Sequence, residues 1–190
     1  MNGQRQNTPG MRRGPLAITM AAAFGAADQF LGARSWLVGS WAVDASLLSA
    51  PWLLVAFFAG WSQPQAKRAV IFGFSCTLAA LVGYAGMTLS PIEGAVVSLN
   101  EVRGLLVGQG AYVVGGLLTG PLFGWFGYRW RTCRDWRGAL AAALVVCCEP
   151  LAHAAVGADV NFHGVWAAEV IIGLLMVFYV IAGTHHRTSS

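Results

Sequence analysis

The stretch from Arg129 to Leu151, RWRTCRDWRGALAAALVVCCEPL, joins a basic connector, an apolar run and a carboxylate within one segment. Its first nine residues contain four arginines, and no charged residue follows until Glu149. Clustered arginines beside an apolar run are typical of a membrane helix that begins at the cytoplasmic face.

The same alternation of apolar segments and short polar connectors continues toward both ends of the chain. Each segment is close to the roughly 20 residues that a helix needs to cross a bilayer. We therefore predict an all-α polytopic membrane protein: a bundle of six transmembrane helices in one domain at 15–183, with a disordered cytoplasmic tail at 1–14 and a second cytoplasmic tail at 184–190. The predicted spans are Pro15–Ala33, Ala45–Trp61, Ala69–Leu89, Val102–Tyr128, Gly138–Ala158 and Gly164–Gly183.

The basic residues are distributed unevenly over the connectors. Ten of the twelve lie in every second connector, and only Arg34 and Arg103 lie in the others, which carry Asp44 and Asp159. Because cytoplasmic loops retain Lys and Arg, this asymmetry predicts that both termini are cytoplasmic and that the protein is a multi-pass protein of the inner (plasma) membrane. The ten are Arg5, Arg12, Arg13, Lys67, Arg68, Arg129, Arg131, Arg134, Arg137 and Arg187.

The composition excludes soluble classes of protein. Hydrophobic residues make up 56% of the 190-residue chain and charged residues 11%, whereas charged residues make up about 25% of a typical soluble domain. The apolar surface therefore needs the lipid bilayer as its partner. Topology explains the formal charge of +4, so nucleic-acid binding is not expected.

The second predicted span is short, and Pro51 lies in its first turn. A proline at this position is tolerated, so we expect a short helix to begin at Ser49–Pro51. The apolar segment Trp36–Leu48 is expected either to lie at the outer interface or to re-enter the membrane. Most tryptophans, including Trp166, lie at predicted span ends and are interpreted as interfacial anchors, whereas the role of Trp52 stays open.

Small residues recur at multiples of four in two of the predicted spans. Such stripes let helix backbones approach closely, which drives helix association in lipid. Packing inside the bundle is the favoured interpretation; the alternative is that the alanine stripe of the first span contacts another membrane protein. The residues are Ala17, Ala21 and Gly25 in the first span, and Gly104, Gly108, Gly116, Gly120 and Gly124 in the fourth.

Several ionisable and polar side chains lie inside predicted spans, where a charged group costs about 2.5–3.5 kcal/mol to insert. The predicted topology collects them in the outer half of the membrane and leaves the inner half apolar. This distribution predicts an outward-facing pocket for a small cationic or hydrogen-bonding solute. The candidate ligand-binding residues are Asp28, Gln29, Tyr84, Gln109, Glu149, His153 and Glu169.

The same residues allow other interpretations. Glu149, His153 and Asp28 would form a network that only fixes helix packing in a structural or assembly subunit. Metal binding by His153, Glu149, His163 and Asp159 lacks a dense ligand motif, so no metal and no cofactor is predicted. No nucleophile elbow or phosphate-binding loop is present, and an integral membrane enzyme is the third possibility.

Two resemblances bear on function. The run LSAPWLLVAFFAGW at 48–61, with Leu81–Tyr84 and Cys148–Leu151, resembles an uncharacterised family of small bacterial integral membrane proteins. More distantly, the six-span layout and the alanines Ala17 and Ala21 resemble the S components of energy-coupling-factor vitamin transporters. That resemblance implies an outward-facing pocket and a docking face for a separate energising protein. Small-solute binding or transport is therefore the expected function.

The charge asymmetry makes a prediction about topology. In a cysteine-free background, a cysteine at Asp159 should react with a membrane-impermeant reagent in intact cells, and a cysteine at Thr132 should not. The reason is that the first lies in an acidic connector and the second in the arginine-rich one. Equal labelling of the two positions, or the reverse order, contradicts the predicted orientation.

Overall fold

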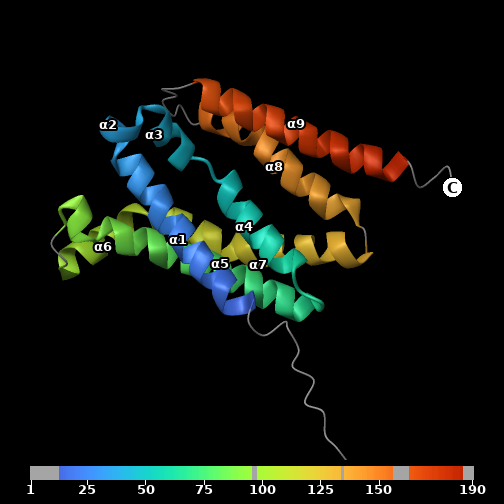
Figure 1. Cartoon of the computed structure of the whole chain (residues 1–190), viewed down its shortest axis with the longest axis horizontal. Helices are drawn as coiled ribbons and strands as arrows, with labels where there is room; N and C mark the ends of the chain where they lie inside the picture. The colour runs from blue at the N-terminus through green and yellow to red at the C-terminus, as the bar shows by residue number, and fades with distance from the viewer. Residues whose placement is uncertain (1–12, 96–97, 134, 156–162, 186–190) are drawn as a thin grey trace, which may run out of the picture.

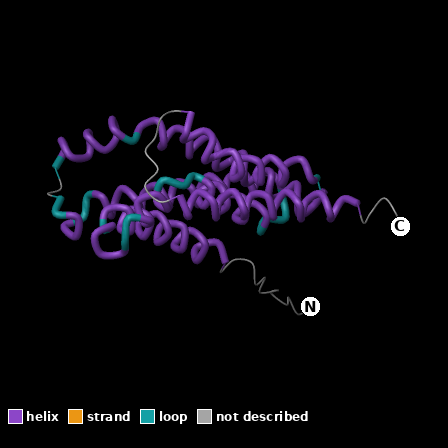
Figure 2. The backbone as a smooth tube through the Cα atoms, turned by 90° about the horizontal axis from the view of Figure 1, so that it is seen from above, coloured by secondary structure: helices purple, strands orange, loops and turns teal. Residues whose placement is uncertain are grey.

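The computed structural model describes residues 13–95, 98–133, 135–155 and 163–185. Over these ranges the chain is helical apart from short connectors (Figures 1 and 2), which confirms the all-α fold class. Most of the two predicted tails lies outside the described residues. The helices are α1 (Arg13–Ala33), α2 (Ser35–Val38), α3 (Trp41–Ser46), α4 (Ala50–Trp61), α5 (Ala66–Thr88), the 3-10 turn η1 (Pro91–Glu93), α6 (Leu99–Gly108), α7 (Gly110–Cys133), α8 (Trp136–Ala155) and α9 (His163–His185).

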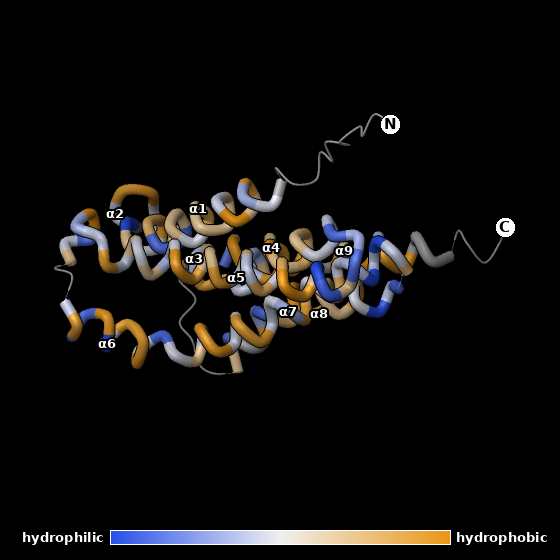
Figure 3. The backbone as a smooth tube through the Cα atoms, turned by 90° about the horizontal axis from the view of Figure 1, so that it is seen from below, coloured by the Kyte–Doolittle hydropathy of each residue, from blue (hydrophilic) through white to orange (hydrophobic). Residues whose placement is uncertain are grey.

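Four of these helices, α1, α5, α8 and α9, are long and apolar enough to cross a membrane, and the bent pair α6 and α7 makes a fifth if it forms one span. Hydrophobic colours recur along the backbone of the helices in Figure 3, and apolar side chains such as Leu118 and Phe178 are 69% and 70% exposed. Lipid is the solvent that such a surface requires. The structure therefore belongs to a membrane protein with four or five candidate spans.

The second predicted span differs from the expectation in length. Its helix, α4, has 12 residues, or about 18 Å at 1.5 Å per residue, whereas a hydrocarbon core is about 30 Å thick. The segment Trp36–Leu48 before it forms the two short helices α2 and α3. The helix begins at Ala50 with Pro51 in its first turn, which agrees with the start expected from the sequence.

The fourth predicted span is not one continuous helix. The axes of α6 and α7 meet at Gln109 with a bend of 65°, and α6 stands apart from the bundle in Figures 2 and 3. A Cβ atom added to Gly104 or Gly108 would meet no atom within 4 Å, so these two glycines of α6 bring no helix close. The break divides the expected glycine stripe, because the helix face that carries the glycines of α6 does not continue into α7.

The glycines of α7 bring three helix backbones into contact. A Cβ atom on Gly124 would lie 2.6 Å from the carbonyl oxygen of Ala69 in α5, and one on Gly60 in α4 would overlap the backbone of Gly124. A Cβ atom on Gly120 would lie 2.5 Å from the hydroxyl oxygen of Thr77 in α5. Glycine is therefore required where α4, α5 and α7 cross.

The small-residue stripe of α1 packs inside the protein. Ala21 is 3% exposed and lies in a cluster with Ala59, Cys76 and Ala80, against which Ala17 also packs. A Cβ atom on Gly25 would overlap the backbone of Ala80. The favoured interpretation of the stripe, packing within the bundle, describes this arrangement.

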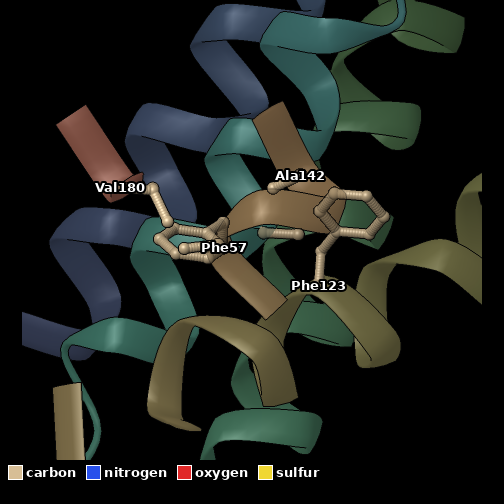
Figure 4. Packing of buried hydrophobic residues seen from close by; sticks show 6 residues of the cluster. Phe57, Phe123, Ala142 and Val180 are labelled. Atoms are coloured by element: carbon tan, nitrogen blue, oxygen red, sulfur yellow. The ribbon is translucent and has the colours of Figure 1, made fainter. Parts of the chain in front are cut away.

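An apolar cluster joins the α8–α9 pair to the other helices. Phe57 of α4 and Phe123 of α7 meet Ala142 of α8 and Val180 of α9 (Figure 4), together with Ala56 and Ala139. These side chains carry no polar group, so the cluster offers no path for water or ions. It lies beside Ala56, one of the residues that line the cavity described below.

The connector between α7 and α8 is held by arginine contacts. Arg129 forms an ion pair with Asp135 at 2.7 Å and lies over the Trp125 ring at 5.0 Å from its centroid. The hydrogen bond from the Arg137 backbone N–H, with the contacts of Arg129, lowers the pKa of Asp135 from its ordinary value. Arg131 donates hydrogen bonds to the carbonyl oxygens of Trp61 and Ser62, which fixes the end of α4.

Two glycines of α5 provide a test of this packing. A Cβ atom on Gly83 would overlap the backbone of Ala22 in α1, whereas one on Gly86 would meet nothing within 4 Å. Gly83→Ala should lower the melting temperature of the purified protein, because overpacking costs about 1–3 kcal/mol. Gly86→Ala is the control and should leave it unchanged or raise it, since alanine favours a helix by up to about 1 kcal/mol over glycine. Two equal shifts would contradict the α1–α5 contact.

Candidate functional site

The N-terminus of α4 lies inside the protein, where Glu149 of α8 meets it. One carboxylate oxygen accepts a hydrogen bond from the backbone N–H of Ser49, and the other accepts one from Ala50 at 2.9 Å. The Ser49 side chain itself makes no capping bond. The carboxylate thus satisfies N–H groups that have no partner within the helix, and it lies at the positive end of the helix dipole.

A polar cluster surrounds this cap. The exposed fractions of Glu149 and Glu169 are 7% and 4%. His153 Nε2 lies 3.8 Å from a carboxylate oxygen of Glu149, and its ring centroid lies 4.8 Å from that of Trp166. Trp166 is 6% exposed, so the structure gives it a place in this cluster instead of the interfacial position expected from the sequence.

A cavity of about 450 Å³ lies beside the cluster. Its walls come from α1, α3, α4, α5, α6, α7 and α8 and from the connector between α3 and α4, and His153 belongs to both the wall and the cluster. The polar or aromatic side chains in the wall include Asp28, Trp52, Thr77, Tyr84, Gln109, Tyr112, Thr119 and His153.

Asp28 and Trp52 organise one side of the cavity. The indole Nε1 of Trp52 donates a hydrogen bond of 3.3 Å to a carboxylate oxygen of Asp28. The Trp52 ring meets Tyr84 edge-on at 6.1 Å between centroids, and it meets Phe24 in the same way at 5.4 Å. These contacts fix the direction of the Asp28 carboxylate and place aromatic rings around it.

Two irregular stretches of backbone lie at this cavity. Leu48 and Ser49, which precede α4, line it, and so does Gln109 at the break between α6 and α7. Irregular backbone inside a membrane domain is tolerated where protein or a water-filled cavity covers it. Interrupted helices whose ends point at the bound solute are also a common design of transporter sites.

The structure brings together most, but not all, of the residues predicted from the sequence. Asp28, Tyr84, Gln109 and His153 line the cavity, whereas Glu149 and Glu169 are not among the lining residues, and Glu149 lies at the start of α4. Gln29 is not among the lining residues.

The sequence assigns no role to Trp52 of the cavity wall and does not identify Asp44 as buried. The indole of Trp52 holds Asp28. Asp44 was placed in a connector, but it is fully buried in α3, a helix that contacts α9. A carboxylate within the apolar segment Trp36–Leu48 was the available signal for Asp44.

Metal coordination was tested on the described part of the chain. There, no group of three or more His, Cys, Asp or Glu side chains is arranged to hold a metal ion. Asp159, one of the ligands considered, lies outside the described residues, and His163 is exposed at the start of α9.

A comparison with known protein families identifies the family of this chain. A family model described as "Family of unknown function (DUF6518)" matches residues 4–190. This is consistent with the resemblance to an uncharacterised family, and the more distant resemblance to S components stays a prediction. No curated protein and no solved structure matches the chain.

The capping role of Glu149 predicts the effect of its substitution. Glu149→Gln should lower the free energy of unfolding by about 2 kcal/mol, because an amide nitrogen cannot accept the second N–H and the charge at the helix end is lost. Glu101→Gln is the matched control, since Glu101 lies in the first turn of α6 but is exposed. Its cost should stay below about 1 kcal/mol. Chemical unfolding in detergent gives both values, and equal costs would contradict the cap.

Proposed function

Since the chain belongs to the DUF6518 family, whose function is unknown, its own cavity is the basis for a function, and we propose that the protein binds a small solute there and carries it across the membrane. The cavity supports this proposal most directly. At about 450 Å³ it lies within the range of roughly 300–1,000 Å³ of known ligand sites.

The chemistry of the wall favours a small organic cation. Among the described residues that line the cavity, Asp28 is the one carboxylate and none is Lys or Arg. Its partner Trp52 and the nearby Tyr84 and Tyr112 supply aromatic rings. An ammonium group is attracted both to a carboxylate and to the face of an aromatic ring, so this combination selects positive charge.

We propose that the cavity opens to the exterior, in a six-span arrangement with both termini in the cytoplasm. In this arrangement α3 and α4 together form a broken second span, and α6 and α7 form a broken fourth span. The arginine-rich connector between α7 and α8 then lies on the cytoplasmic side of the membrane, in agreement with the positive-inside rule. The apolar cluster around Phe57 and Phe123 closes the cytoplasmic side.

A structural or assembly subunit is the second candidate, and the cap formed by Glu149 favours it because that contact serves packing. Helix packing alone does not require a cavity with an oriented carboxylate, which favours solute binding. A partner protein that docks on α1 would meet the exposed side chains of Leu16 and Met20, since Ala21 is covered.

Substitution of Asp28 tests the proposed function. Small ammonium compounds of graded size, such as tetramethylammonium and choline, should raise the melting temperature of the wild-type protein, and their neutral carbon isosteres should not. Asp28→Asn should abolish this stabilisation because it removes the charge and keeps the shape. Gln29→Ala is the control and should retain it, since Gln29 does not line the cavity.

Each result separates the alternatives. Equal stabilisation by the neutral isosteres would contradict the choice of a cation. Stabilisation that persists in Asp28→Asn would contradict the proposed site.

A further inference from the structure

Four buried polar atoms of the cluster around Glu149 have no hydrogen-bond partner among the described residues. They are both carboxyl oxygens of Glu169, Nδ1 of His153 and Nε1 of Trp166. Buried polar groups in native proteins are nearly always paired, so an unpaired set in one place requires an explanation. Glu169, at 4% exposure, is the most costly of them if it is ionised.

One bound proton explains how two buried carboxyl groups, Glu149 and Glu169, can lie in the same cluster. Glu169 lies one turn after Trp166 in α9, and the Trp166 ring lies against His153, one turn after Glu149 in α8, so the two carboxyl groups belong to one cluster. The oxygens of Glu149 already accept the N–H groups of Ser49 and Ala50. Two ionised carboxylates contain no donor, so a hydrogen bond between them forms only if one carries a proton. A protonated Glu169 would donate a hydrogen bond to Glu149. The Glu169 carboxyl group would then have a partner, and one negative charge would be removed.

The surroundings do not neutralise a second charge in another way. The N-terminus of α4 supplies about half a positive charge, and Glu149 occupies it. In the described chain, neither Glu149 nor Glu169 forms a salt bridge with a Lys or Arg. Among the described residues, Cys147 and His153 of α8 are titratable groups near the pair, and α3, which contacts α9, carries Asp44.

His153 connects this pair to the cavity. It lines the cavity wall, and its Nε2 lies 3.8 Å from a carboxylate oxygen of Glu149. A proton from the cavity that binds at Nε2 can therefore be handed to the carboxyl pair, where one O–H bond forms as the N–H bond breaks, and it can leave by the same route. No other group gains or loses charge in this exchange.

We infer that Glu149 and Glu169 form a proton-binding site that shares one exchangeable proton and opens through His153 to the cavity. The site is distinct from the solute site at Asp28, and it needs no solute to exist. Its occupancy changes the charge at the start of α4.

The proton site and the solute site meet through α4. Glu149 holds the backbone of Ser49 and Ala50, and Trp52, in the same first turn, holds Asp28. Loss of the proton places a second charge beside the cap, which weakens the hold on this turn and shifts Trp52. Proton release and cation binding are thereby coupled, and this step alone rests on the proposed function.

Infrared spectroscopy tests the proton site without any solute. The wild-type protein in lipid nanodiscs at neutral pH should show the carbonyl band of a protonated carboxylic acid, with a downward shift in heavy water. Glu169→Gln should lose this band and remain folded, since its amide can still donate to Glu149. The control Glu101→Gln should retain it, because Glu101 is exposed. A wild-type spectrum without the band, or a band that persists in both Glu169→Gln and Glu149→Gln, would overturn the inference.

A transport measurement tests the coupling separately. In liposomes with an imposed pH gradient, the wild-type protein should move choline, and Glu169→Gln should fall to the level of protein-free liposomes while choline still raises its melting temperature. Gradient-driven transport that survives in Glu169→Gln would overturn the coupling. If the carboxylic acid band is present but choline binds to no variant, the proton site is supported and the proposed function is contradicted.

Discussion

The requirement that every backbone N–H and C=O group be paired in an environment without water governs this structure. Most helices meet it internally, but α4 begins inside the protein, and its first N–H groups need an outside partner. Glu149 provides one from α8, about one hundred residues away in the chain. That contact fixes where α4 starts, and with it the position of Trp52, the orientation of Asp28 and one wall of the cavity.

Close packing of backbones provides the complementary constraint. In lipid, helices gain little from burying apolar side chains, so association depends on close approach at small residues. Gly124 and Gly60 let α4, α5 and α7 cross tightly, and Gly25 and Gly83 do the same for α1 and α5. The pair α8 and α9 joins this group through the apolar cluster around Phe57. The cavity lies between these tightly packed helices, where α6 bends away at Gln109.

The polar groups divide into two sets with different roles. Asp28, with the aromatic rings of Trp52 and Tyr84, faces the cavity and has the chemistry of a cation site. Glu149 and Glu169 are covered, and they have the chemistry of a proton site. His153 is the residue common to both. In the proposed function, such an arrangement lets the energy of a proton gradient reach a solute that never touches the carboxyl pair.

The sequence predicts the helical class, the approximate positions of the apolar segments and most of the polar residues of the cavity and of the cluster around Glu149. It could do so because apolar runs and buried charges are local signals. Only the tertiary structure decided that α6 and α7 are separate helices, that Gly104 and Gly108 have no neighbour, and that Trp166 is buried. It also decided which acceptor serves the start of α4. The sequence around Ser49 does not indicate that a carboxylate of a distant helix pairs with it. The partner of a helix end depends on position in space and not on spacing along the chain.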